Sequence, residues 1–216
     1  MPDNGIIHVV LADDHAMVRE ALAQILEESG SIRVVGQAED GLEVQRIVAQ
    51  TNPDVVVLDY TMPKLDGPAA IEALLGQYPK IKILVLTVHE SIHYAVKVLE
   101  GGAQGYVVKS AAVKELVEAI KAVHAGEVYI SPKVSQKVIQ HLRRPKRDRA
   151  GLDALSQREF DLLRVLGAGM GLAQAAEHLN ISTSTASTYR ARLMEKLQLG
   201  NTAEIIRFAL ENEIVG

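Results

Sequence analysis

The feature that most constrains the fold of this chain is a regular alternation of short β-branched runs and amphipathic stretches. The β-branched runs predict strands at residues 8–12, 33–38, 54–58, 82–86 and 105–107. The amphipathic stretches predict helices near residues 16–29, 41–50, 67–77, 91–100 and 112–125. Five such units in order predict an α/β fold, in which a doubly wound parallel sheet of five strands carries helices on both faces.

The last third of the chain contains no strand pattern. Ser156 and Glu159 have the spacing of a capping box and begin one predicted helix. Further helices are expected at 172–179, at 183–197 behind the N-cap Ser182, and at 202–210. A short helix, a tight turn and a longer helix are typical of a helix-turn-helix. We therefore expect a small all-α domain after the α/β domain.

Charge is distributed unevenly between these parts. Of the total of −4, residues 1–130 carry −8, residues 131–149 carry +6 and residues 150–216 carry −2. The segment HLRRPKRDRAG contains Pro and ends in Gly, which indicates an exposed linker. Its charge would serve either solubility or attraction to a polyanion. Its clustered cationic residues are Arg143, Arg144, Lys146, Arg147 and Arg149.

The chain has no Cys, which excludes disulfides, zinc thiolate sites and thiol nucleophiles. Its most apolar run, residues 83–88, is far shorter than the roughly 18 residues that a membrane span needs. The first residues, MPDNGIIHVVLADD, are acidic, whereas a signal peptide begins with basic residues. We expect a soluble cytoplasmic protein with no membrane partner.

Three carboxylates follow predicted strands: Asp13 and Asp14 after the first, and Asp59 after the third. In a doubly wound sheet these strands are neighbours at the point where ligands bind, so the three carboxylates should converge. Three like charges need a cation, and a hard divalent ion such as Mg²⁺ fits oxygen ligands. The alternative is that each Asp is a separate helix cap or turn residue.

Thr87 and Lys109 end the fourth and fifth predicted strands. A hydroxyl and an ammonium that face a carboxylate and a metal could bind the oxygens of a phosphoryl group. A carboxylate can itself accept such a group and form an acyl phosphate. The alternative for Lys109 is a solvated loop lysine.

These residues carry a family resemblance. The DD pair after the first strand, the segments VVVLDYTMPKLDG and ILVLT, and the segment GYVVKS resemble the receiver domain of two-component response regulators. The resemblance implies a flavodoxin-like receiver domain, placed at residues 1–126. It also implies that Asp59 accepts a phosphoryl group from the phosphohistidine of a partner histidine kinase.

The resemblance also assigns roles around Asp59. The implied Mg²⁺ ligands are Asp13, Asp14, Asp59 and the backbone carbonyl of Thr61. Thr87 and Lys109 would bind the phosphoryl group. Tyr106 would be an aromatic switch whose ring moves with Thr87, whereas strand propensity alone reads it as a packed strand aromatic.

The segments LSQRE, GMGLAQAAEHLNIS and TSTASTYRARLMEKL resemble the helix-turn-helix domain of the NarL/FixJ (LuxR-type) regulators. We place this domain at residues 151–216, after a linker at 127–150. Helical spacing puts Ser184, Ser187, Thr188, Ala191 and Glu195 on one face, and Ala186, Leu193 and Leu197 on the buried side. The expected DNA-binding residues are Thr183, Ser184, Thr185, Ser187, Thr188, Arg190, Ala191, Arg192 and Lys196.

Together these features predict a regulator that is not an enzyme, is phosphorylated on Asp59, and binds promoter DNA as a dimer. One alternative is a response regulator whose output is protein binding, because the helical block is net acidic and Glu195 lies on the predicted DNA face. The other is a small phosphatase that uses the Asp cluster. Against the phosphatase, the cluster has no separate general base.

Overall fold

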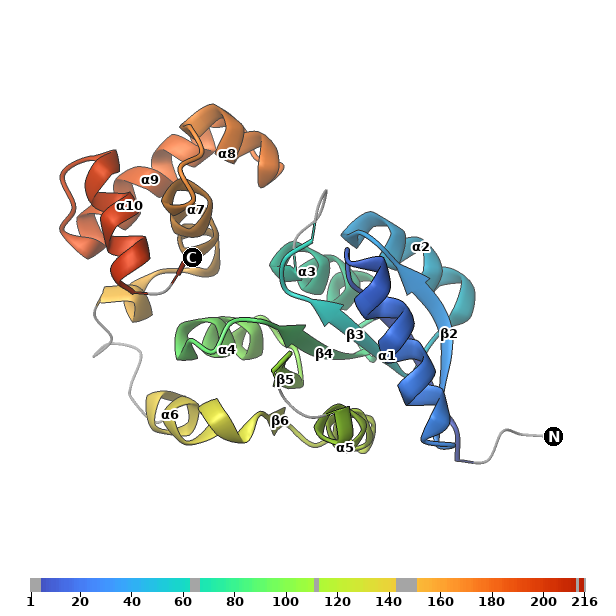
Figure 1. The fold of residues 1–216 in the computed structure, drawn as a ribbon. Coiled ribbons are helices and arrows are strands. Elements are labelled where there is room, and N and C mark those ends of the chain that lie inside the picture. The colour runs from blue at the N-terminus through green and yellow to red at the C-terminus, as the bar shows by residue number, and fades with distance from the viewer. Residues whose placement is uncertain (1–4, 63–66, 111–112, 143–150, 213, 216) are drawn as a thin grey trace. The chain divides into compact units, whose positions relative to one another are not determined.

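The computed structural model describes residues 5–62, 67–110, 113–142, 151–212 and 214–215 (Figure 1). The chain divides into two compact units, Met1–Val138 and Ile139–Gly216. The first is called the receiver unit, after the domain that its sequence resembles, and the second the helical unit.

A parallel sheet forms the centre of the receiver unit, with strand order β2-β1-β3-β4-β5-β6. The strands are β1 (Ile7–Ala12), β2 (Ile32–Ala38), β3 (Val55–Asp59), β4 (Lys82–Thr87), β5 (Gly105–Val108) and β6 (Tyr129–Ile130). The predicted doubly wound parallel sheet is confirmed, because β1 and β3 are neighbours and β2 lies outside β1. Every residue of β3 is buried, as its unbroken apolar run requires.

The predicted number of five strands is wrong, since β6 adds a sixth. It pairs in parallel with β5, with Gly105 opposite Tyr129 and Tyr106 opposite Ile130. Two half-buried residues carry no alternating pattern, so only their pairing with β5 makes them a strand.

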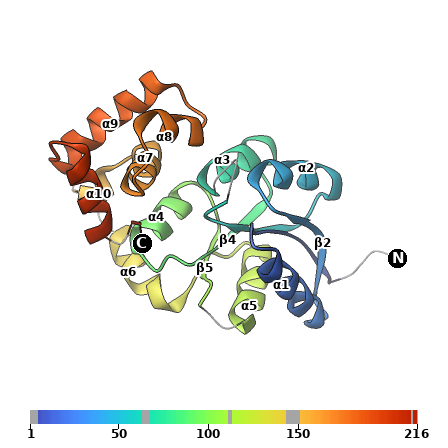
Figure 2. The same ribbon diagram turned by 45° about the horizontal axis from the view of Figure 1, so that its top comes forward.

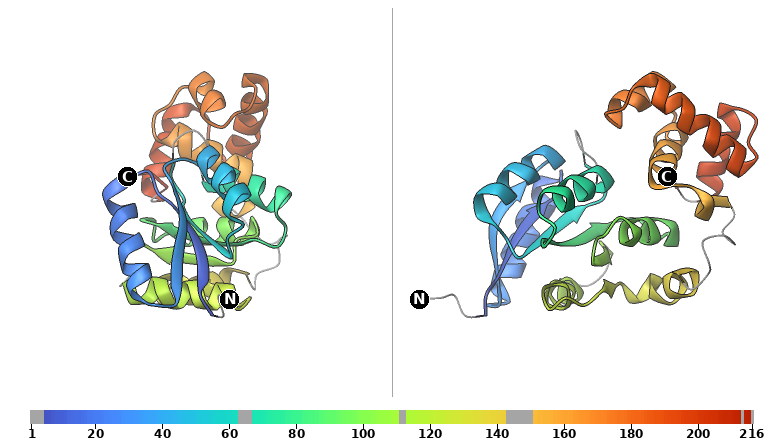
Figure 3. Two further views of the ribbon diagram at one scale, coloured as in Figure 1. Left: turned by 90° about the vertical axis from the view of Figure 1, so that its right-hand side faces the viewer. Right: turned by 180° about the vertical axis from the view of Figure 1, so that it is seen from behind.

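Helices cover both faces of this sheet (Figures 2 and 3). They are α1 (Ala16–Glu28), α2 (Gly41–Thr51), α3 (Gly67–Gln77), α4 (Ile92–Glu100) and α5 (Val113–His124). Alternate strand residues such as Val9, Val57 and Leu84 join Leu26 of α1 and Ile120 of α5 in one apolar cluster. Helices α2 and α3 pack against each other. This packing fixes the strand ends, where the polar residues of the candidate site lie.

In its described part from residue 151 on, the helical unit contains a short 3₁₀ turn and four α-helices. They are η2 (Gly151–Ala154), α7 (Gln157–Gly167), α8 (Leu172–His178), α9 (Thr183–Leu197) and α10 (Thr202–Glu211). The Ser156 hydroxyl accepts the backbone N–H of Glu159, and the Glu159 carboxylate accepts that of Ser156, which confirms the predicted capping box. Helix α7 packs on α9 and α10, and α8 packs on α9. The predicted helix-turn-helix, α8 to α9, is present.

The segment predicted as a linker, residues 127–150, is partly regular. Its described part holds β6 and α6 (Pro132–Leu142). The predicted basic residues Arg143, Arg144, Lys146, Arg147 and Arg149 lie outside the described residues.

Candidate functional site

The structure brings Asp13, Asp59 and Lys109 together at the carboxyl ends of β1, β3 and β5. The Lys109 ammonium donates to Oδ2 of Asp13 at 2.6 Å and to Oδ2 of Asp59 at 2.7 Å. The two acidic side chains are only 4% and 7% exposed, and that of Lys109 is 17% exposed. Lys109 is therefore a partly buried bridge between two carboxylates and not a solvated loop lysine.

The electrostatics of this cluster follow from burial and from the bridge. Burial raises the pKa of Asp59, and this outweighs the lowering by Lys109. Burial lowers the pKa of Lys109, but its hydrogen bonds to Asp13 and Asp59 raise it by more. Lys109 therefore stays protonated beside the two carboxylates, whose negative charges would be unfavourable in this buried position without a cation.

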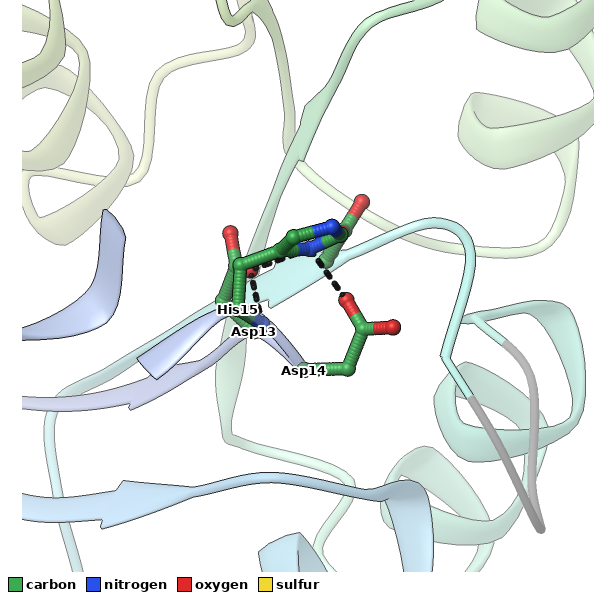
Figure 4. A group of neighbouring side chains, drawn as sticks. Asp13, Asp14 and His15 are labelled. Carbon is green, nitrogen blue, oxygen red and sulfur yellow. Dashed lines mark hydrogen bonds and ion pairs between the residues drawn. The ribbon is translucent and has the colours of Figure 1, made fainter. Parts of the chain in front are cut away.

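Asp14 is more exposed than Asp13 and Asp59, and Figure 4 shows it beside Asp13 and His15. Nδ1 of His15 lies 2.7 Å from the Asp14 carboxylate, and the backbone N–H of His15 donates to Asp13. One ligand atom each from Asp13, Asp14, His15 and Asp59 falls within 4.8 Å of the others. Carboxylate oxygens so close together fit a hard divalent cation.

His15 was not among the predicted site residues, although its place directly after two acids could have indicated it. Thr61 lies next to the cluster, because its backbone N–H donates to Asp59 Oδ1 at 3.3 Å. That contact leaves the role predicted for the Thr61 carbonyl open to test.

Thr87 and Tyr106, the predicted switch pair, are fully buried and both contact the backbone of His89. The Thr87 hydroxyl accepts the His89 N–H at 3.2 Å, and the Tyr106 hydroxyl donates to the His89 carbonyl at 2.7 Å. Burial raises the pKa of Tyr106, so this hydroxyl stays protonated and able to donate. The loop after β4 thus joins the two residues.

Three aromatic rings hold the same loop. The His89 ring stacks on Tyr94 of α4 with centroids 4.0 Å apart, and Tyr94 meets Tyr60 edge to face at 4.9 Å. Because Tyr60 directly follows Asp59, the loop after β4 is packed against the residue next to the candidate phosphoacceptor. Sequence reasoning missed this cluster, since its members lie on three different elements.

In the helical unit, α9 presents the predicted face to solvent. Ser184, Ser187, Thr188, Ala191 and Glu195 are exposed, whereas Ala186, Leu193 and Leu197 are buried. Thr183 and Arg192 are also exposed, and Thr185 is partly exposed next to the N-cap Ser182, whose hydroxyl accepts its N–H. The orientation that helical spacing predicts for α9 is confirmed.

Two cations of α9 are already bound within the unit. Arg190 donates to the Thr202 hydroxyl at 2.9 Å, and the Lys196 ammonium lies 2.6 Å from a Glu159 carboxylate oxygen. Glu159 is buried, which raises its pKa, but the hydrogen bonds from Lys196 and Ser156 lower it by more. Lys196 therefore stabilises the capping box of α7. The sequence predicts only a phosphate contact for this residue.

The chain resembles known proteins over almost its whole length. Residues 9–121 match the response regulator receiver domain, and residues 153–209 match the bacterial regulatory proteins of the luxR family. The chain therefore belongs to the response regulators of NarL/FixJ type, as its sequence motifs indicate. That family consists of transcriptional regulators.

Particular relatives cover both units. The response regulator GacA of Pseudomonas aeruginosa is 33% identical over 210 residues, which cover 97% of this chain and 98% of GacA. The oxygen regulatory protein NreC of Staphylococcus carnosus is 33% identical over 217 residues, which cover 96% of this chain and 98% of NreC. A structure of the RcsB response regulator of Salmonella typhimurium has a TM-score of 0.79 at 25% identity and covers 96% of this chain and 98% of RcsB. Among the described helices, none is long and apolar enough to cross a membrane.

Proposed function

We propose that Asp59 accepts a phosphoryl group from the phosphohistidine of a partner histidine kinase. A carboxylate oxygen of Asp59 would attack phosphorus, so that an O–P bond forms while the P–N bond breaks and its electron pair leaves on the imidazole nitrogen. The observation that carries the proposal is the Lys109 bridge, which places a cation 2.7 Å from the Asp59 carboxylate. Thr87 and Lys109 would then bind the phosphoryl oxygens.

The acidic cluster fits a divalent cation, and we assign Mg²⁺ to Asp13, Asp14, Asp59 and the Thr61 carbonyl. When bound, Mg²⁺ would supply positive charge against the dianionic phosphoryl group. Thr87 and Tyr106 would carry the change to the surface, because both contact His89 in the loop after β4.

For the helical unit we propose binding to promoter DNA as a dimer, through the predicted residues of α9. A structure of RcsB from Salmonella enterica serovar Typhimurium bound to a promoter in the presence of a phosphomimetic has a TM-score of 0.75 with this chain. We keep the domain boundaries at 1–126, 127–150 and 151–216, and place the protein in the cytoplasm, where its DNA lies. A protein-binding output is the second candidate, supported by exposed Glu195 on the same face.

Labelling by acetyl phosphate tests the assignment. The parent protein should be labelled only with Mg²⁺, Asp59→Asn should not be labelled, and the exposed Glu118→Gln should be labelled like the parent. Full labelling of Asp59→Asn, or labelling unaffected by a chelator, would overturn the assignment. Multiple turnover on a phosphoester would instead favour the phosphatase alternative.

A further inference from the structure

A small polar cluster joins the first turn of α6 to the two loops that end β4 and β5. The Lys133 ammonium lies 3.0 Å from Oε1 of Glu90 and 2.9 Å from the Ser110 hydroxyl. That hydroxyl donates to the same Glu90 oxygen at 3.0 Å. The three polar atoms close a triangle, which we call the loop latch.

Both loops also carry groups of the phosphoryl site. Ser110 directly follows Lys109, and Glu90 directly follows His89, whose backbone binds Thr87 and Tyr106. The two loops are joined at their bases, because the Lys109 N–H donates to the Thr87 carbonyl at 2.6 Å. A movement of Lys109 therefore displaces its neighbour Ser110, and a movement of the His89 backbone displaces its neighbour Glu90.

The start of α6, which carries Lys133 of the latch, is anchored next to Tyr106 through Ser131. Ser131, which is buried, donates its backbone N–H to the Tyr106 carbonyl at 2.9 Å, and its hydroxyl accepts the Val108 N–H at 3.2 Å. The same hydroxyl binds the carboxylate of Glu115 on α5. Since the N–H groups of residues 134 and 135 donate to the Ser131 carbonyl, the first turn of α6 starts from a fixed point on the sheet.

The latch is weak enough to open and close. The Lys133 and Glu90 side chains are 54% and 53% exposed, so water and salt screen their attraction. Hydrogen bonds from Lys133 and Ser110 lower the pKa of Glu90, which keeps its carboxylate charged. An exposed pair of this kind shifts an equilibrium by roughly 1.5- to 5-fold, which suits modulation of a signal.

We propose that Glu90, Ser110 and Lys133 couple the loops of the phosphoryl site to α6, the helix that leads into the helical unit. The proposal rests on the phosphorylation of Asp59 proposed above. Ser110 and Lys133 act here as positioning residues, because neither touches the reacting carboxylate. Lys133 lies beyond the part that matches the receiver domain, residues 9–121, whereas Glu90 and Ser110 lie within it.

Hydrogen exchange of the full-length protein, with and without beryllofluoride plus Mg²⁺, tests the latch. In the parent, exchange should change in both loops and in α6. In Lys133→Glu the loop response should persist, while the α6 response falls about two- to fivefold. The double variant Glu90→Lys with Lys133→Glu exchanges the two charges and should restore the α6 response. If Lys133→Glu acted only by destabilising α6 locally, the second substitution would not restore that response. Lys137→Ala, exposed on the same helix, is the matched control.

Each outcome bears on a different claim. If beryllofluoride changes hydrogen exchange in the loops of the parent protein but not in α6, the latch proposal alone is overturned. Failure of the charge swap to restore the α6 response also overturns it, as does an equal loss in Lys137→Ala. Loops that do not respond to beryllofluoride overturn the phosphorylation proposal together with the latch.

Discussion

The receiver unit and the helical unit place their candidate functional groups in opposite surroundings. In the receiver unit, Asp13, Asp59 and Thr87 are buried at the ends of three strands, and Lys109 bridges the two acids. In the helical unit, the candidate DNA residues all lie on one helix, α9, and most of them are exposed. A buried charge needs a partner from another element, whereas an exposed face needs only its own helix to be formed. Changes in the receiver site should thus cost more stability than changes on the α9 face.

The largest effect is expected for Lys109→Met. The variant leaves two buried carboxylates without their shared cation, so the receiver unit should lose about 3–5 kcal/mol of unfolding free energy. Mg²⁺ should restore part of the loss by taking the place of the ammonium charge. Urea denaturation followed by far-UV circular dichroism, with and without Mg²⁺, gives the measurement. Lys114→Met, exposed on α5, is the control and should stay within about 0.5 kcal/mol of the parent.

A buried charge in the helical unit sharpens the comparison. Lys196→Met removes the partner of buried Glu159 and should cost about 1.5–3 kcal/mol at pH 7. Because the pKa of Glu159 is lowered in the folded protein, the parent gains this stability above the ordinary pKa of 4.5 and loses it as the pH falls below that value.

The deficit of Lys196→Met should therefore be complete at pH 7 and should shrink as the pH falls from 4.5 through the lowered pKa of Glu159. Hydrogen exchange of α7 peptides across this range provides the readout. The exposed pair of Arg207 and Glu211 on α10 supplies the control Arg207→Met, with little change expected. A deficit that stays constant with pH would show that the Glu159 charge is not what Lys196 stabilises.

One helix cap from each unit allows the same comparison with smaller expected losses of stability. Asp40 is buried and accepts the N–H groups of Leu42 and Glu43, whereas exposed Asn201 accepts that of Glu204. Replacing either cap by Ala should cost about 1 kcal/mol, and Asp40→Ala should cost the more. Thermal unfolding of both variants measures the difference. A larger loss for Asn201→Ala would reverse the expected order of the two units.

The smallest effect is expected on the α9 face. Glu195→Lys should leave stability unchanged and tighten binding to a random-sequence duplex about two- to fivefold at low salt. Each phosphate contact steepens the dependence of log affinity on log salt by about 0.9, so the variant should show a steeper slope and Arg192→Gln a flatter one. A salt titration measures both, with Glu211→Lys on α10 as the control. Unchanged slopes would favour the protein-binding output.

The local pattern of the sequence already determined most of the fold and indicated most of the candidate residues in both units. Strand ends placed Asp13, Asp59, Thr87 and Lys109 at one edge of the sheet, because parallel strands share that edge. Helical spacing separated the exposed and buried faces of α9, because a helix repeats every 3.6 residues. These features depend on residues that are close in sequence, or on a topology that the order of the elements implies.

Only the tertiary structure decided which partner each side chain takes. Lys109 finds Asp13 from 96 residues away, and Lys196 finds Glu159 from 37 residues away, where a phosphate contact was expected. Strand β6 exists only by pairing with β5, and Lys133 meets Glu90 only because α6 begins beside the same strand. Hydrogen bonds and ion pairs form between groups a few ångströms apart in space, and no periodicity in the chain records that distance.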